Sequence, residues 1–180
     1  MTRYRFFERQ MATYSTYHRD PRNRLTHFFG VPAIIFALMV AMALWRGEVG
    51  GVNVSFAMVF SAAVLVMWLV MDIGIAGPLT VLLAPLLALA EYLASTSTLG
   101  TAWIVFAVFF VGGWAVQLWG HYYEGRKPAL VDNLFQIFVA PMFLTAELLI
   151  MAGFRKSLHR RVEAYIAETY PDYALSQAAS

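Results

Sequence analysis

Long runs of apolar residues alternate with short polar segments along this chain. The apolar runs cover residues 28–45, 52–71, 74–94, 101–119 and 134–152, and few charges fall inside them. As a helix, a run of about 20 residues crosses the roughly 30 Å hydrocarbon core of a bilayer. The pattern therefore predicts an all-α protein: a multi-pass transmembrane helical bundle with four to five spans.

The composition supports this fold class. Apolar residues make up 60% of the 180 residues and charged residues only 13%, whereas soluble domains have about 45–50% and 25%. So few polar side chains do not cover a water-soluble globule of this size. We expect an integral membrane protein without a cleaved signal peptide, because charges are spread over the segment before residue 28.

Both ends of the chain have an amphipathic pattern instead. Segment 1–18 mixes Tyr, Phe and Met with Arg and Glu, which is typical of a helix at the membrane interface. Asp20-Pro21 predicts a helix break, because Asp caps helices and proline suits the first helical turn. The single membrane domain, 1–180, then divides into five parts. Interfacial helices with a first polar motif cover residues 1–27, and four spans cover 28–119. A second polar motif follows at 120–133, a fifth apolar run at 134–152 and an amphipathic tail at 153–180.

The charges bear on orientation and on partners. Six arginines precede the first span, and the short loops between the spans carry at most one basic residue each. The positive-inside tendency therefore predicts a cytoplasmic N-terminus. The net charge of +2 gives no reason to expect a nucleic-acid partner. With no cysteine in the chain, disulfides, iron–sulfur clusters and thiol catalysis are excluded, and any metal must be held by His, Asp, Glu, Asn or Tyr.

Three of the four histidines fall where the topology can bring them together. His18 and His27 flank the Asp20-Pro21 break and can converge, although positions nine apart on one continuous helix point in opposite directions. Four apolar runs separate His27 from His121, and four crossings return the chain to the same side. This parity argument favours a metal site of His18, His27 and His121. The alternative, three polar residues at a membrane surface, stays open.

Two polar residues accompany these histidines, and the fourth histidine does not join them on sequence grounds. Asn23 precedes His27 by four residues and Glu124 follows His121 by three, so each shares a helical face with its histidine. Five crossings put His159 opposite the site, yet its basic surroundings favour the side of the N-terminus. The sequence leaves the side of the C-terminus open.

Two motifs carry a resemblance to a known family. The stretch YHRDPRNRLTHFFGVP, with its YHxxPxNxxxH core, and the stretch WAVQLWGHYYEGRKPALVDN resemble the family named for metabolism of phytosphingosine to odd-numbered fatty acids. That family consists of membrane-bound, iron-dependent 2-hydroxy fatty-acid dioxygenases. The resemblance runs from about residue 10 to about residue 154 and includes the helix pattern between the motifs. One departure is the three-residue spacing from His121 to Glu124, where family members usually have four.

The resemblance implies a cofactor, a reaction and a set of roles. It matches His18, His27 and His121 to the family's histidines, and so implies an Fe(2+) site with open positions for a 2-hydroxy fatty acid and O2. The implied reaction releases CO2 and a fatty acid one carbon shorter. Asn23 and Glu124 would then orient ring N–H groups or supply a fourth ligand, and the acyl chain would occupy an apolar cleft between spans. Four basic residues beside the motifs are hypotheses for binding the substrate carboxylate, with phospholipid headgroups as an equal alternative: Arg22, Arg24, Arg126 and Lys127.

Three other kinds of protein compete with this interpretation. A di-iron hydroxylase or desaturase needs a much larger histidine cluster than four histidines provide. A non-enzymatic small membrane transporter or lipid-binding scaffold remains an alternative, in which the same His and Arg residues contact headgroups. Zinc is also open, since imidazoles suit it as well as iron.

Overall fold

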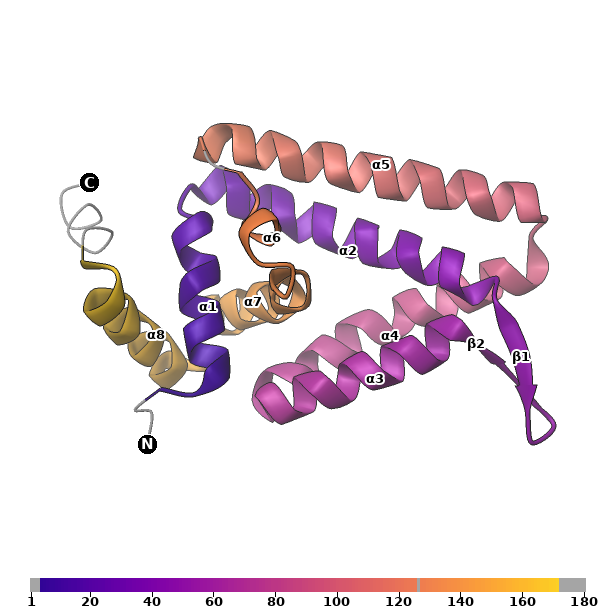
Figure 1. Cartoon of the computed structure of the whole chain (residues 1–180), viewed down its shortest axis with the longest axis horizontal. Helices are drawn as coiled ribbons and strands as arrows, with labels where there is room; N and C mark the ends of the chain where they lie inside the picture. Colours follow the sequence, from indigo (N-terminus) through magenta and orange to yellow (C-terminus); the bar gives the residue numbers. More distant parts are fainter. Residues whose placement is uncertain (1–3, 126, 172–180) are drawn as a thin grey trace.

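The computed structural model describes residues 4–125 and 127–171 and is helical except for one short hairpin (Figure 1). Arg126 lies outside the described residues. The elements, in chain order, are α1 (Phe6–Tyr17), α2 (Pro21–Ala43), β1 (Arg46–Val49), β2 (Val52–Ser55), α3 (Phe56–Met71), α4 (Ile73–Thr96), α5 (Leu99–Glu124), α6 (Ala129–Asp132), α7 (Gln136–Met151) and α8 (Lys156–Thr169).

The predicted all-α membrane bundle is confirmed. Three helices, α2, α4 and α5, are long and apolar enough to cross a membrane, and the count rises to four if α7 and α8, bent by 118°, are taken as one span. Large apolar side chains such as Val70 and Val81 are 83% and 73% exposed, as expected for side chains that face lipid. The structure thus has three to four candidate spans, and the upper count equals the lower end of the expected four to five. The helix α3, with 16 residues, is only about 24 Å long and falls short of a full span.

The helices α2 and α5 lie antiparallel along most of their length (Figure 1), and small residues let them approach closely. A Cβ atom added at Gly113 would lie 2.8 Å from Ile34 Cγ1, and one added at Gly30 would lie 2.6 Å from Gln117 Cγ. At Gly120 the same atom would lie 2.0 Å from Thr26 Oγ1. In lipid, such small-residue contacts allow close packing of helix backbones. Close packing here brings the last turn of α5 against the first turns of α2.

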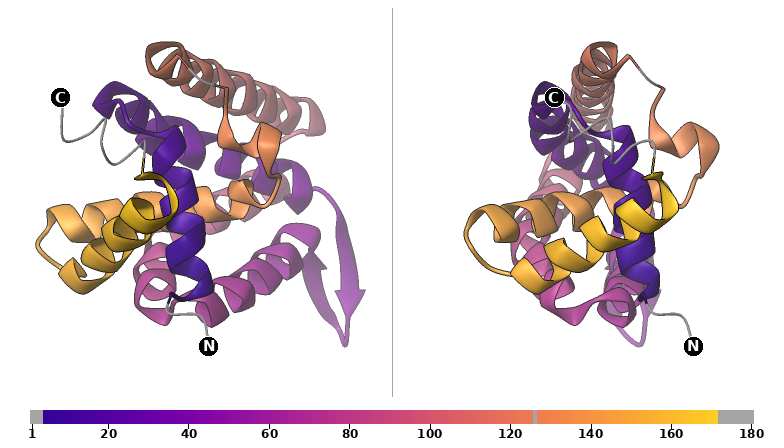
Figure 2. Two further views of the ribbon diagram at one scale, coloured as in Figure 1. Left: turned by 60° about the vertical axis from the view of Figure 1, so that its left-hand side comes forward. Right: turned by 90° about the vertical axis from the view of Figure 1, so that its left-hand side faces the viewer.

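The apolar face of the N-terminal helix α1 packs against other helices of the protein, whereas we expected it at the membrane interface. Phe7, Met11 and Tyr14 are at most 3% exposed, and α1 contacts both α7 and α8 (Figure 2). Polar contacts hold the same arrangement: Arg161 of α8 pairs with Glu8 at 2.9 Å. An amphipathic pattern indicates that one face is covered, and here the cover is α7 and α8.

The hairpin β1–β2 was not predicted. Its antiparallel register pairs Arg46 with Ser55 and Val49 with Val52, and the two central glycines have φ of 58° and 81°. Tight hairpins require such left-handed backbone, which glycine adopts at no steric cost. The apolar run expected from residue 52 therefore begins as a strand, and its helix starts at Phe56.

Candidate metal centre

The break between α1 and α2 is the local feature that brings two histidines together. Asp20 is the N-cap of α2, where its side chain accepts a hydrogen bond from the backbone N–H of Arg22 at 2.8 Å, and Pro21 begins the helix. His18 is the C-terminal cap of α1. The chain turns sharply between α1 and α2, so His18 faces His27 of α2 with 3.2 Å between the two Nε2 atoms (Figure 1).

His121, from the end of α5, completes a cluster of three imidazoles. The ring centroids are 4.5 Å apart for His18 and His27, 5.2 Å for His18 and His121, and 5.0 Å for His27 and His121. One nitrogen from each ring lies within 4.8 Å of the others, and the three residues are only 2–6% exposed. The convergence expected from sequence parity is therefore present in the fold.

Hydrogen bonds define which ring nitrogens point inward. His18 Nδ1 lies 2.9 Å from the Tyr14 carbonyl oxygen, and His27 Nδ1 lies 2.9 Å from the Asn23 carbonyl oxygen. A backbone carbonyl only accepts, so Nδ1 carries the proton in both rings. In a neutral imidazole Nε2 is then an acceptor. Burial, followed by the neighbouring His27 ring, lowers the pKa of His18 to about 2, so this imidazole is neutral at physiological pH.

This geometry suits a metal ion. Two acceptor nitrogens that face each other at 3.2 Å repel unless a cation lies beside both. Two imidazole nitrogens bound to one ion, each at about 2.0–2.1 Å, are separated by about 3 Å. Carbonyl partners on the outer ring nitrogens are also the usual way in which proteins fix the tautomer of a metal-binding histidine. The residues therefore fit a metal held by three nitrogen ligands.

Two aromatic residues that were not predicted to belong to the site position the His18 ring. Tyr14 stacks on His18 with ring centroids 3.9 Å apart and planes inclined by 5°. Phe143 of α7 packs against Tyr14 at 4.6 Å and against His18 at 6.2 Å. Tyr14 precedes His18 by one helical turn, a spacing that indicates contact. No comparable signal marks Phe143 within the apolar run of α7.

Glu124 binds the turn that carries His18 instead of a ring N–H group. Its carboxylate accepts hydrogen bonds from the backbone N–H groups of Arg19 and Asp20 at 2.9 Å, and from Asn23 Nδ2 at 3.0 Å. Asn23 thus contributes its carbonyl oxygen to His27 and its side-chain amide to Glu124. The outer nitrogens of His18 and His27 are held by backbone carbonyls, whereas we expected side chains in this role.

The basic residues beside the motifs differ in their surroundings. Arg22 forms an ion pair with Asp20 at 2.7 Å and lies over the Tyr123 ring at 4.3 Å. Lys127 pairs with Asp132 at 2.5 Å. Both side chains are more than half exposed. Arg126 lies outside the described residues, so its predicted role in binding the substrate carboxylate stays a prediction.

Arg24 is placed differently from these residues. It pairs with Glu147 of α7 at 3.1 Å, one helical turn beyond Phe143. Its positive charge is also close enough to His18 to be among the causes that lower the pKa of that ring. The fourth histidine, His159, is exposed on α8 and lies outside the three-histidine group.

These features define a class: an all-α membrane protein with a candidate metal centre at one end of its bundle. The family model described as 2-hydroxy-palmitic acid dioxygenase Mpo1-like matches residues 4–152. The 2-hydroxy-palmitic acid dioxygenase MPO1 of Saccharomyces cerevisiae is 32% identical over 162 residues, which are 86% of this chain and 86% of the yeast protein. The chain belongs to the Mpo1-like family, as its two motifs predicted. No solved structure matches it.

Proposed function

We propose that this protein is an Fe(II)-dependent dioxygenase that cleaves 2-hydroxy fatty acids into CO2 and the fatty acid one carbon shorter. Membership of the Mpo1-like family and the name of the yeast relative support the substrate class and the reaction type. The observation that carries the proposal is the cluster of His18, His27 and His121, in which the facing Nε2 atoms of His18 and His27 suit a bound cation.

The proposed reaction balances with oxygen as the sole oxidant. A 2-hydroxy acid, R–CH(OH)–COOH, and O2 give R–COOH, CO2 and H2O, with cleavage of the C1–C2 bond. The acid loses four electrons and one O2 gains four. No separate electron donor is needed, which agrees with a chain of 180 residues whose motifs include no nucleotide-binding fingerprint.

Three imidazoles suit ferrous iron because they leave coordination positions open. When bound, iron would supply a site for the hydroxyl and carboxylate of the substrate and for O2. The chain's own part is to hold the three rings in place. Burial keeps the His18 ring neutral, and the Tyr14 and Asn23 carbonyl oxygens hold the Nδ1–H groups of His18 and His27.

We assign the substrate carboxylate to Arg24, among the four basic residues considered. Arg24 pairs with Glu147 at 3.1 Å, and its side chain is 37% exposed, so an arriving carboxylate can replace Glu147 as its partner. Arg22 and Lys127 are bound to Asp20 and Asp132 at the exposed surface. A guanidinium binds a carboxylate through two parallel hydrogen bonds, which orients the C1–C2 bond.

The test is metal content together with turnover. Protein purified without oxygen is analysed for iron and zinc, and O2 consumption is then followed with a long-chain 2-hydroxy acid. We expect one iron per chain and formation of the shortened acid. His27→Ala and His121→Ala each lower iron affinity by more than about a hundredfold, since even the loss of partners outside the metal's own ligands costs 10–100-fold.

His159→Ala is the matched control, because it removes the histidine that lies outside the cluster. We expect it to retain iron and activity. Zinc in place of iron, or folded wild-type protein without metal and without O2 consumption, would refute the proposed activity.

A further inference from the structure

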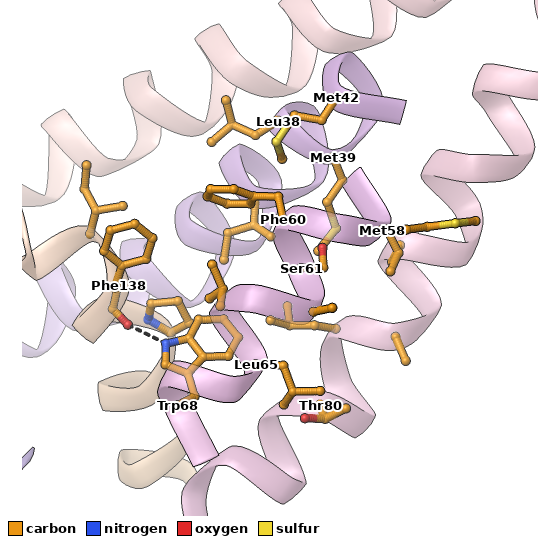
Figure 3. A pocket seen from close by; sticks show the side chains of 18 residues that line it. Leu38, Met39, Met42, Met58, Phe60, Ser61, Leu65, Trp68, Thr80 and Phe138 are labelled. Atoms are coloured by element: carbon orange, nitrogen blue, oxygen red, sulfur yellow. Dashed lines mark hydrogen bonds between the residues drawn. The ribbon is translucent and has the colours of Figure 1, made fainter. Parts of the chain in front are cut away.

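A cavity of about 390 Å³ lies between α2, α3, α4 and α7 (Figure 3). Its lining side chains are apolar except for Ser61, Thr80 and the indole N–H of Trp68. The Thr80 hydroxyl donates to the Ala76 carbonyl oxygen at 2.7 Å, and the Trp68 N–H donates to the Phe138 carbonyl oxygen at 2.9 Å. With the Thr80 and Trp68 donors bound to the backbone, the cavity offers little to a polar ligand and suits an apolar one.

The wall that α2 contributes lies on the same helical face as His27. Residues 27, 31, 35, 38 and 42 follow at intervals of four, four, three and four, which is a single stripe along a helix. Ile35, Leu38 and Met42 of this stripe line the cavity. With a rise of 1.5 Å per residue, the cavity begins about 12 Å from His27 and extends to about 22 Å. About two turns of α2, with Val31 on this face, lie between.

The cavity has an end near the imidazoles and a far end. On α7, Pro141 lines the cavity two residues before Phe143, which packs against His18. The helices α3 and α4 run antiparallel from their junction at Asp72, so Trp68 and Thr80 lie toward the same end. Met42 and Met58 lie at the opposite end from Trp68 (Figure 3). Met42 is four residues before β1, and Met58 is three residues after β2.

We infer that this cavity binds the alkyl chain of the 2-hydroxy fatty acid and that its far end limits the length of the chain. The inference rests on the proposed function, which puts the polar head of the substrate at the three imidazoles. The cavity is apolar, begins about 12 Å from His27 on the helix face that carries it, and has the volume of a ligand site, about 300–1,000 Å³. The unbranched side chains of Met42 and Met58 adapt to irregular apolar surfaces, which suits a flexible alkyl chain.

Filling the cavity tests the inference with substrates of graded chain length. In Ala84→Phe a phenyl ring would occupy the space where the chain runs. We expect kcat/KM for long-chain 2-hydroxy acids to fall by about tenfold or more, while the value for short-chain acids stays within about twofold. Ala63→Phe is the control, because Ala63 is exposed on α3 and does not line the cavity. Bound iron is measured in both variants, so that a folding defect is recognised.

A second test needs no turnover. The chain has no cysteine, so one introduced thiol reports on one position. Leu65→Cys puts a thiol in the cavity wall and Ala63→Cys puts one outside it. We expect a long-chain 2-hydroxy acid, added without oxygen, to slow maleimide labelling of Leu65→Cys several-fold and to leave Ala63→Cys unchanged.

Two results would overturn the inference while leaving the proposed function intact. One is an unchanged chain-length profile in active, iron-loaded Ala84→Phe. The other is a Leu65→Cys thiol that phospholipid vesicles protect but the 2-hydroxy acid does not, which would make the cavity a gap filled by bilayer lipid. Loss of the proposed function is recognised separately, by wild-type protein that contains no iron and consumes no O2.

Discussion

Two carboxylates, one at each end of the bundle, connect elements that are distant in sequence, and they do so with different partners. Glu124, at the end of α5, accepts from the backbone N–H groups of Arg19 and Asp20 and from the Asn23 side-chain amide. Glu91, near the end of α4, accepts from the Arg46 guanidinium at 2.6 Å and from the Ser55 hydroxyl. The first set of donors is mostly backbone, and the second set is entirely side chain.

The difference explains what each carboxylate can fix in place. Side-chain donors change rotamer at small cost, so Glu91 tethers the hairpin without fixing the backbone in detail. Backbone N–H groups cannot reorient without moving the chain, so Glu124 fixes the turn that begins one residue after His18. We therefore interpret Glu124 as a positioning residue for the proposed metal centre and Glu91 as a local support of the hairpin.

The largest expected effect comes from Glu124→Gln. Glutamine has one acceptor oxygen in place of two, and its NH2 group would face an N–H donor. We expect iron affinity to fall about 10–100-fold and the free energy of unfolding to fall by about 1.5–3 kcal/mol, the value of hydrogen bonds to a charged group. Competition with a graded series of chelators measures the affinity. Iron affinity equal to that of the wild type would remove the distinction drawn between the two carboxylates.

The next effect tests the close approach of α5 to α2 at the same end. In Gly120→Ala the new Cβ atom would lie 2.5 Å from Asn23 Oδ1 and 3.2 Å from Asn23 Cα, and the backbone atom yields only if the helices separate. We expect a loss of about 1–3 kcal/mol in stability and weaker iron binding, because His121 moves away from His27. Gly112→Ala is the control, since nothing lies within 4 Å of its added atom. Equal behaviour of the two variants in thermal unfolding would contradict this account.

Much of this end of the molecule follows from local sequence rules. The break at Asp20-Pro21 is a capping signal that acts over a few residues, so the turn between His18 and His27 was predictable. Parity of the apolar runs then brought His121 to the same end. The argument needs only that α2, α3, α4 and α5 alternate in direction (Figure 1), so the result held even though the second run begins as a strand and α3 is short.

Other features depend on tertiary contacts that residue identities do not reveal. The donors to Glu124 are mostly backbone N–H groups, which every residue except proline carries. Phe143 and Glu147 lie in an apolar run of α7 where no spacing relates them to His18. The apolar face of α1 was visible in the sequence, but whether lipid or α8 covers it depends on how the chain folds back after α7.

A charged pair at each end extends the comparison. Arg24–Glu147 lies beside the imidazoles, and Arg46–Glu91 lies at the hairpin. For Arg24→Gln we expect the KM for 2-hydroxy acids to rise about tenfold, the size of one lost charge-assisted hydrogen bond, with bound iron unchanged. Arg22→Gln should leave KM within about twofold. Steady-state kinetics of the two variants test the assignment. A raised KM in Arg22→Gln alone would move it to Arg22, and a wild-type KM in both variants would leave Arg126 or Lys127.

The smallest effect is expected from Glu91→Gln. The Arg46 side chain is 27% exposed and that of Glu91 14%, so water reaches part of this pair, and solvent-screened ion pairs contribute about 0–1 kcal/mol. Glutamine also keeps an acceptor for the Ser55 hydroxyl. Unfolding measurements should therefore show a loss below about 1 kcal/mol, and iron content and KM should equal those of the wild type. Because the hairpin lies at the other end of α2 from His27, a change in iron affinity here would mean that the two ends are coupled through α2. Both carboxylates would then influence iron binding, and they would differ only in the size of that effect.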